Sequence, residues 1–173
     1  VTTGRMRLVE VIPADGVDEA ELLRLAGALE HASEHPIARA VAAGALERLG
    51  GGPALVDGFA STQGLGVHGV VDGHAVVAGR ATWLADEWAL RLDQRLTVAR
   101  GAAESAGRTV IAVGWDGAVT GLLVVADTVK ASSAEAVASL KALGLRPVLL
   151  TGDNATTARA VADEVGIDFI AGP

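Results

Sequence analysis

The chain has 173 residues, half of them apolar, which is enough for one large domain or for a domain with part of another. Its formal net charge of −7 argues against nucleic acid or an anionic membrane surface as the main partner, and the absence of cysteine excludes disulfides and thiolate metal sites. The longest apolar runs fall far short of the about 18 residues that a spanning helix needs, so we expect no membrane insertion of this piece.

The first 120 residues predict an α+β unit in which an antiparallel sheet packs against helices. In chain order we expect a strand at 5–12, helices at 18–31 and 36–49, strands at 55–60, 66–71 and 75–78, helices at 82–87 and 90–106, and strands at 109–115 and 118–125. Asp18 and Pro36 are typical of helix starts, because an Asp side chain caps free N–H groups and a proline has none to cap. Asp72-Gly73 and Asp116-Gly117 predict tight hairpin turns.

After Asp127 the pattern changes to a helix at 132–143, a buried strand at 147–150 and a helix at 155–165. This alternation is typical of a parallel, doubly wound α/β sheet. Two helices and one or two strands cannot close such a sheet, so we expect an incomplete α/β unit.

The segment 30–36, Glu-His-Ala-Ser-Glu-His-Pro, lies at a helix boundary and carries two candidate ligand contacts. His35 comes directly before Pro36, so its ring can point outward from a fixed backbone and stack on a flat aromatic ligand. The carboxylate of Glu30 could accept hydrogen bonds from an exocyclic amine. The residues alone leave another interpretation open, in which His35 only caps the helix and Glu30 is an ordinary exposed helix residue.

Two further segments suit a phosphate-bearing ligand. Gly64 and Gly66 allow close approach of a ligand and can turn N–H groups toward phosphate oxygens, although a plain turn or bulge explains them as well. Thr151 and Asp153 follow the buried strand, at the carboxyl end where ligands of α/β sheets collect. The Thr151 hydroxyl could bond a phosphoryl oxygen, and Asp153 could orient a metal or simply cap the next helix.

These segments, in this order and spacing, resemble the heavy-metal-transporting (type IB) P-type ATPases such as the copper exporters. The resemblance covers the whole chain and rests on Val1-Thr2-Thr3-Gly4, Glu30, Ser33-Glu34-His35-Pro36, Gly64-x-Gly66, Gly79-Arg80, Asp127-Thr128-Val129-Lys130 and Thr151-Gly152-Asp153. It implies three parts: residues 1–4 as a remnant of the phosphorylation domain, 5–120 as the nucleotide-binding domain, and 121–173 as part of a haloacid-dehalogenase-like phosphorylation domain.

The resemblance also implies roles for single residues. It places ATP adenine beside His35 and Glu30, with Gly64, Gly66 and Gly79 lining the nucleotide cleft. Many members of the family have Asn where this chain has Arg80, so the contact of that Asn is in question here. The Arg80 guanidinium could meet a phosphate instead.

In the second half the resemblance makes Asp127 and Lys130 part of the hinge between the two domains. Thr151 matches the residue that steadies the transferred phosphoryl group, and Asp153 is its neighbour in the same element. The implied chemistry is phosphoryl transfer from ATP to an aspartate, helped by magnesium and lysine charges.

The implied ligands are ATP or ADP with Mg²⁺, whose site is expected mostly outside this sequence; we assign no metal ligand within it. The expected partners are the rest of the pump, namely its actuator domain and transmembrane helices, so that the chain would be a cytoplasmic domain of a membrane protein, in a bacterial plasma membrane. The phosphorylated aspartate and the Gly-Asp-Gly-x-x-Asn-Asp element are also expected outside, which would leave this piece inactive alone. Two alternatives are a haloacid-dehalogenase-type phosphatase and a non-catalytic interaction domain.

Overall fold

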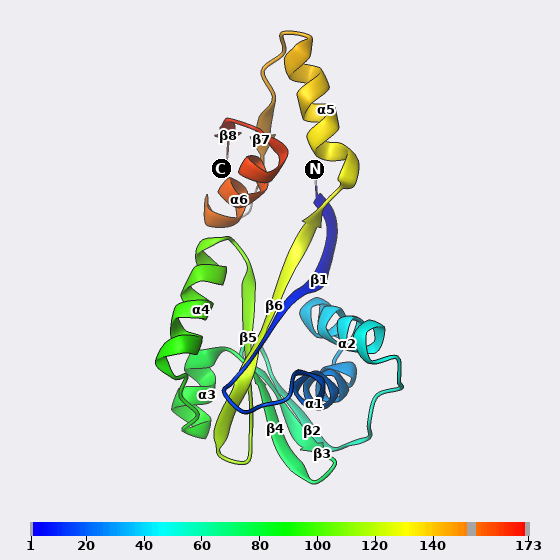
Figure 1. The fold of residues 1–173 in the computed structure, drawn as a ribbon, viewed down its shortest axis with the longest axis vertical. Helices are drawn as coiled ribbons and strands as arrows, with labels where there is room; N and C mark the ends of the chain where they lie inside the picture. The colour runs from blue at the N-terminus through cyan, green and yellow to red at the C-terminus, as the bar shows by residue number, and fades with distance from the viewer. Residues whose placement is uncertain (1, 152–154, 172–173) are drawn as a thin grey trace.

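The computed structural model describes residues 2–151 and 155–171 (Figure 1). The elements in chain order are β1 (Thr2–Pro13), α1 (Glu19–His31), α2 (Pro36–Leu49), β2 (Val56–Thr62), β3 (Gly66–Val71), β4 (His74–Gly79), α3 (Ala81–Trp88), α4 (Gln94–Ser105), β5 (Thr109–Trp115), β6 (Ala118–Val129), α5 (Ala131–Ala142), β7 (Val148–Leu150), α6 (Ala155–Val165) and β8 (Phe169–Ala171). None of the helices in these described ranges is long and apolar enough to cross a membrane.

Six strands form one antiparallel sheet in the order β1-β6-β5-β4-β3-β2. Helices α1 and α2 cover one face, and α3 and α4 cover the other (Figure 1). The predicted antiparallel sheet with flanking helices is therefore confirmed. The hairpin turns fall where Asp72 and Asp116 take positive φ angles of 47° and 53°, each followed by a glycine with positive φ.

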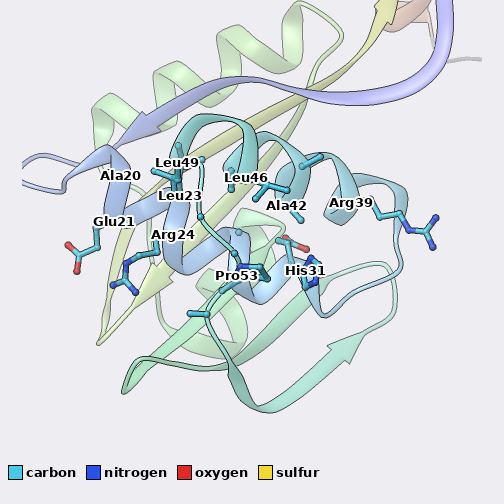
Figure 2. Close-up of a pocket in the computed structure, with 18 of the residues that line it drawn as sticks. Ala20, Glu21, Leu23, Arg24, His31, Arg39, Ala42, Leu46, Leu49 and Pro53 are labelled. Carbon is cyan, nitrogen blue, oxygen red and sulfur yellow. The ribbon is translucent and has the colours of Figure 1, made fainter.

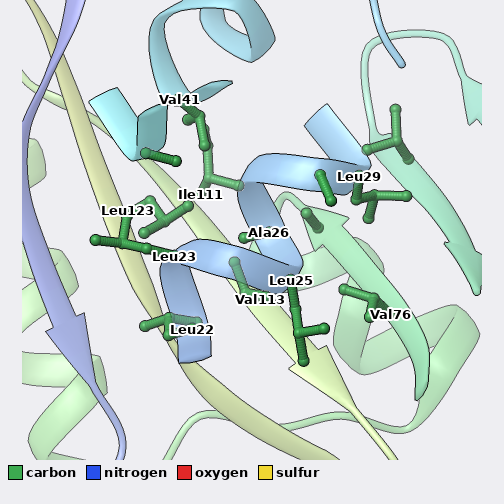
Figure 3. Close-up of a cluster of buried hydrophobic side chains, with 14 of the residues drawn as sticks. Leu22, Leu23, Leu25, Ala26, Leu29, Val41, Val76, Ile111, Val113 and Leu123 are labelled. Carbon is green, nitrogen blue, oxygen red and sulfur yellow. The ribbon is translucent and has the colours of Figure 1, made fainter. Parts of the chain in front are cut away.

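The larger core lies between the sheet and the α1–α2 pair (Figure 3). Leu22, Leu25 and Leu29 of α1 are fully buried, because their helical spacing puts them on one stripe. Neighbouring residues of β6 serve opposite faces, since strand side chains alternate. Leu123 therefore packs in this core and Leu122 in the smaller one under α3 and α4.

Both helix starts expected from capping residues are found. The Asp18 carboxylate accepts a hydrogen bond from the N–H of Glu21 at 3.1 Å, and Pro36 opens α2. The helix expected from residue 90 instead begins at Gln94. Asp93 is its N-cap and accepts a bond from Leu96 N–H at 2.7 Å, so that residues 90–92 precede the helix.

Strand β6 runs four residues beyond its expected end and crosses the expected domain boundary after residue 120. Residues 122–125 are fully buried in the six-stranded sheet, and pairing with β1 continues to the partners Thr2 and Val129. The carboxylate of Asp127 accepts bonds from the Thr3 hydroxyl and the Arg5 N–H, each at 3.2 Å. The two strands thus leave the sheet together as a ribbon toward α5 (Figure 1); the domain boundaries stay a prediction.

Beyond that ribbon, β7 and β8 form a two-stranded parallel sheet that packs with α5 and α6. Its small core consists of Val137, Leu149, Ala162, Val165 and Ile167. Parallel strands joined by a helix are the expected α/β pattern.

Candidate functional site

A cavity of about 260 Å³ opens between the α1–α2 connection and strands β2 to β5. It is lined by all six residues that the sequence assigned to nucleotide contact: Glu30, His35, Gly64, Gly66, Gly79 and Arg80. They come from three stretches of chain: residues 30–35 between α1 and α2, residues 64–66 at the start of β3, and residues 79–80 between β4 and α3. Only folding brings them together.

Glu30 lies in the last turn of α1, four residues after Ala26, and this spacing continues the buried stripe of the helix. Its side chain is only 5% exposed, so the interpretation of Glu30 as an exposed helix residue is wrong. Burial raises the pKa of its carboxyl to about 7, because the charged form loses hydration. Among the described residues no hydrogen bond or ion pair satisfies this carboxylate, which leaves it available to a ligand that donates hydrogen bonds.

His35 is the N-cap of α2, and its Nδ1 accepts a hydrogen bond from the Ile37 N–H at 3.2 Å. The interpretation of His35 as a helix cap is therefore confirmed, and it does not exclude contact of the ring with a ligand. This bond requires an unprotonated Nδ1, so the proton of the neutral ring lies on Nε2. Because Pro36 and the cap fix the ring base while the residue stays exposed, one ring face can still receive a flat ligand.

The three glycines that line the cavity are needed for different physical reasons. Gly64 has a φ of +72°, and a Cβ built on it would meet nothing within 4 Å. Gly66 and Gly79 face each other as partners across β3 and β4. A Cβ on Gly79 would lie 2.3 Å from the Leu65 carbonyl oxygen, and one on Gly66 would lie 2.5 Å from the Trp83 ring. Gly66 and Gly79 thus permit close strand packing under the cavity, which the loop interpretation of the Gly64-x-Gly66 segment did not include.

The sequence assigned no ligand role to several residues that line the cavity. Ser33 provides a hydroxyl that accepts a 3.3 Å bond from the His35 N–H. Thr62 and Thr109 add further hydroxyls, and Ile37 and Ile111 add apolar wall. Of these residues only Ser33 could have been found from the sequence, because a serine two residues before a helix cap commonly forms a local turn through its hydroxyl.

The other predicted site residues lie away from this cavity's lining. Asp127 holds the β1–β6 ribbon, and Lys130 is the N-cap of α5 with an exposed side chain that makes no cap bond. Thr151 follows β7 directly and is half-buried. Asp153 lies outside the described residues. The hinge and phosphoryl-contact roles of these residues stay predictions.

A larger cavity of about 980 Å³ lies on the outer side of the α1–α2 pair (Figure 2). Its walls come from α1, α2 and residues 51–54, and Leu23, Leu46 and Pro53 project around it. Of the predicted contacts only Glu30 borders it, and it has no glycine from the β-sheet. We assign the site to the smaller cavity, because a nucleotide needs polar groups that converge on it as well as volume.

The described residues contain no group of three or more His, Asp or Glu side chains that could hold a metal ion. The cavity itself offers a single carboxylate, Glu30. These described residues therefore do not form a complete Mg²⁺ site.

Known proteins resemble this chain in both sequence and fold. A family profile of haloacid dehalogenase-like hydrolases matches residues 1–173. A probable copper-exporting P-type ATPase of Mycobacterium tuberculosis is 45% identical over 98% of this chain, which covers 22% of that protein. A copper-transporting P-type ATPase of Rhizobium leguminosarum bv. viciae is 42% identical over 98% of the chain and 20% of its own length. A zinc-transporting PIB-type ATPase has a solved structure that superposes with a TM-score of 0.86 at 32% identity, covering 99% of this chain and 27% of that one.

The chain therefore belongs to the haloacid dehalogenase-like hydrolase family. Within that family its relatives place it with the heavy-metal P-type ATPases, and it spans about a fifth of the length of the curated proteins that it matches. The family profile suits a phosphatase equally well, and it is the relatives that favour the ATPase interpretation.

Proposed function

We propose that the chain is the nucleotide-binding part of a heavy-metal cation-translocating P-type ATPase, where it positions ATP for phosphoryl transfer to an aspartate. The observation that carries this proposal is the convergence of three separate stretches of chain on one cavity around a buried, unpaired carboxylate. An adenine would stack on the exposed His35 ring and donate its exocyclic N–H to Glu30. The strands below, held close by Gly66 and Gly79, form the floor.

The cavity size fits this arrangement. Small-molecule pockets usually measure about 300–1,000 Å³. At about 260 Å³ this cavity lies just below that range, so it would enclose the base and sugar and leave the phosphates at its edge. The phosphates would then point out of the cavity toward other parts of the pump. We propose those parts, including the actuator domain and transmembrane helices, as partners, and Mg²⁺ as the ion that accompanies ATP. The chain would thus be a cytoplasmic portion of a bacterial plasma-membrane pump.

We propose copper as the transported cation, because the relatives at 45% and 42% identity are named as copper transporters. The zinc-transporting relative is less similar, at 32% identity. Comparing ATP hydrolysis by the parent protein with Cu⁺ and with Zn²⁺ decides between the two cargoes.

The role of His35 is tested by separating its ring from its cap. The substitution His35→Asn keeps a good N-cap and removes the ring. We expect it to weaken ATP and ADP binding about tenfold, since stacking on an aromatic ring is worth roughly 1–3 kcal/mol, while the thermal midpoint stays nearly unchanged. Calorimetric titration and thermal unfolding of the same samples measure both effects.

The matched control is His35→Ala, which removes ring and cap together. It should show the same loss of affinity and also lose about 1 kcal/mol of unfolding free energy. Normal ATP affinity in the His35→Asn variant would show that the ring does not contact the nucleotide.

A further inference from the structure

Arg80 is the only arginine or lysine among the described residues that line the small cavity. Its side chain is exposed, and no described carboxylate forms an ion pair with it. Some other arginines of the same sheet and its helices are paired, for example Arg24 with Asp72 and Arg95 with Asp15 at 3.2 Å. A guanidinium left unpaired at a ligand cavity is available to an anionic group of the ligand.

The backbone of Arg80 is fixed beside the loop that carries Gly64. The Arg80 N–H donates to the Leu65 carbonyl oxygen at 2.8 Å, and the Leu65 N–H donates to the Thr62 carbonyl oxygen at 3.0 Å. The space above Gly64 is open, since a Cβ there would meet nothing within 4 Å. Arg80 therefore has an anchored backbone and an exposed side chain, and the neighbouring Gly64 leaves free space in the lining of the same cavity.

Arg80 is also the N-cap residue of α3, but its side chain makes no capping bond. The first N–H groups of α3 consequently receive no capping bond from the Arg80 side chain and leave a partial positive charge beside this residue. The opposite chemistry lies at Glu30, whose buried carboxylate borders the same cavity. The same cavity thus offers a group that accepts hydrogen bonds and a group that attracts negative charge, and a nucleotide requires both.

We propose that Arg80 binds a phosphate group of the nucleotide, so that the site selects adenosine di- and triphosphates over adenosine. The inference rests on the proposed nucleotide site and adds its specificity. A guanidinium can form two parallel charge-assisted hydrogen bonds to phosphate oxygens, which a shorter neutral side chain cannot.

The test compares ADP with adenosine on the intact chain, by calorimetry and by resonance shifts at constant ionic strength. Arg80→Gln should weaken ADP binding about tenfold, the size expected for a lost charge-assisted hydrogen bond, and leave adenosine binding unchanged. Arg80→Lys should restore part of the loss. The control is Arg91→Gln, because Arg91 is also exposed and does not line the cavity; it should change neither ligand.

Two results would overturn the role of Arg80 while leaving the nucleotide site intact. One is unchanged ADP affinity in Arg80→Gln; the other is an equal loss for ADP and adenosine, which would mean that the substitution disturbs the cavity itself. If the unaltered chain binds neither ligand at millimolar concentration, the proposed function fails and this specificity fails with it.

Discussion

Replacing Glu30 with glutamine is expected to stabilise the chain at pH 8 and to have a much smaller effect on its stability at pH 5. The folded-state pKa of about 7 lies above the ordinary value of 4.5 because the carboxyl is buried. The folded protein therefore keeps a proton that the unfolded chain releases, and unfolding becomes easier as pH rises from about 4.5 to about 7. At about 1.4 kcal/mol per pKa unit, this penalty reaches on the order of 3 kcal/mol, and a neutral amide avoids it.

Urea unfolding of both proteins at pH 5 and pH 8 measures this difference. Glu34→Gln is the matched control, because Glu34 is a neighbouring glutamate that is exposed; it should have little effect at either pH. If Glu30→Gln shows the same pH dependence as the unaltered chain, the Glu30 carboxyl is not the group that titrates near neutrality.

The same substitution should weaken ATP binding, and the pH dependence of affinity identifies the cause. An adenine amine donates a stronger hydrogen bond to the charged carboxylate than to the neutral carboxyl, so ATP binding below pH 7 is weakened by the proton on Glu30. ATP affinity should accordingly rise with pH up to about 8 in the unaltered chain and stay nearly flat in Glu30→Gln. The stability lost by keeping Glu30 would then be the cost of its role in binding, a common relation between stability and function.

Replacing Gly79 with alanine is expected to destabilise the chain strongly. The new Cβ would lie 2.3 Å from the Leu65 carbonyl oxygen and 2.7 Å from the Gly66 Cα, so strands β3 and β4 would have to separate. Overpacking of this kind costs about 3 kcal/mol, or more where backbone must move. Nucleotide affinity should fall as well, because these strands form the floor of the cavity.

Gly64→Ala provides the comparison in urea unfolding. The strain of a positive φ costs about 1–2 kcal/mol there, but the space around Gly64 is open. Gly79→Ala should therefore lower the free energy of unfolding clearly more than Gly64→Ala does. Equal losses at both positions would contradict the close pairing of β3 with β4.

Features with local causes could be predicted from the sequence. Asp18 determines where α1 starts, Pro36 determines where α2 starts, and the glycines after Leu49 determine where α2 ends. Each of these residues acts on its own turn of helix. The start of α4 was placed too early because Leu90 continues the apolar pattern, although it is buried in the core before the helix begins. The end of β6 depends on its pairing with β1, more than 100 residues earlier in the chain.

In the site, too, local features could be predicted from the sequence, and features that depend on distant contacts could not. The sequence motifs identified Glu30, His35 and the glycines, and the cavity contains all of them. A motif could not show that Glu30 is buried. Nor could it show that Gly66 and Gly79 are cross-strand partners, which pack so closely that neither position has room for a side chain. These properties depend on contacts between distant segments, so they appear only in the folded chain.

The most direct measurement of the central claim is a titration of the isotope-labelled chain with ATP, followed by backbone amide resonances. The proposed site predicts the largest shifts at residues that line the small cavity, such as His35, Gly64 and Gly66, and small shifts around Leu46 in the larger cavity (Figure 2). Shifts concentrated in the larger cavity, or none at millimolar ATP, would contradict the assignment of this chain as the nucleotide-binding part of the pump.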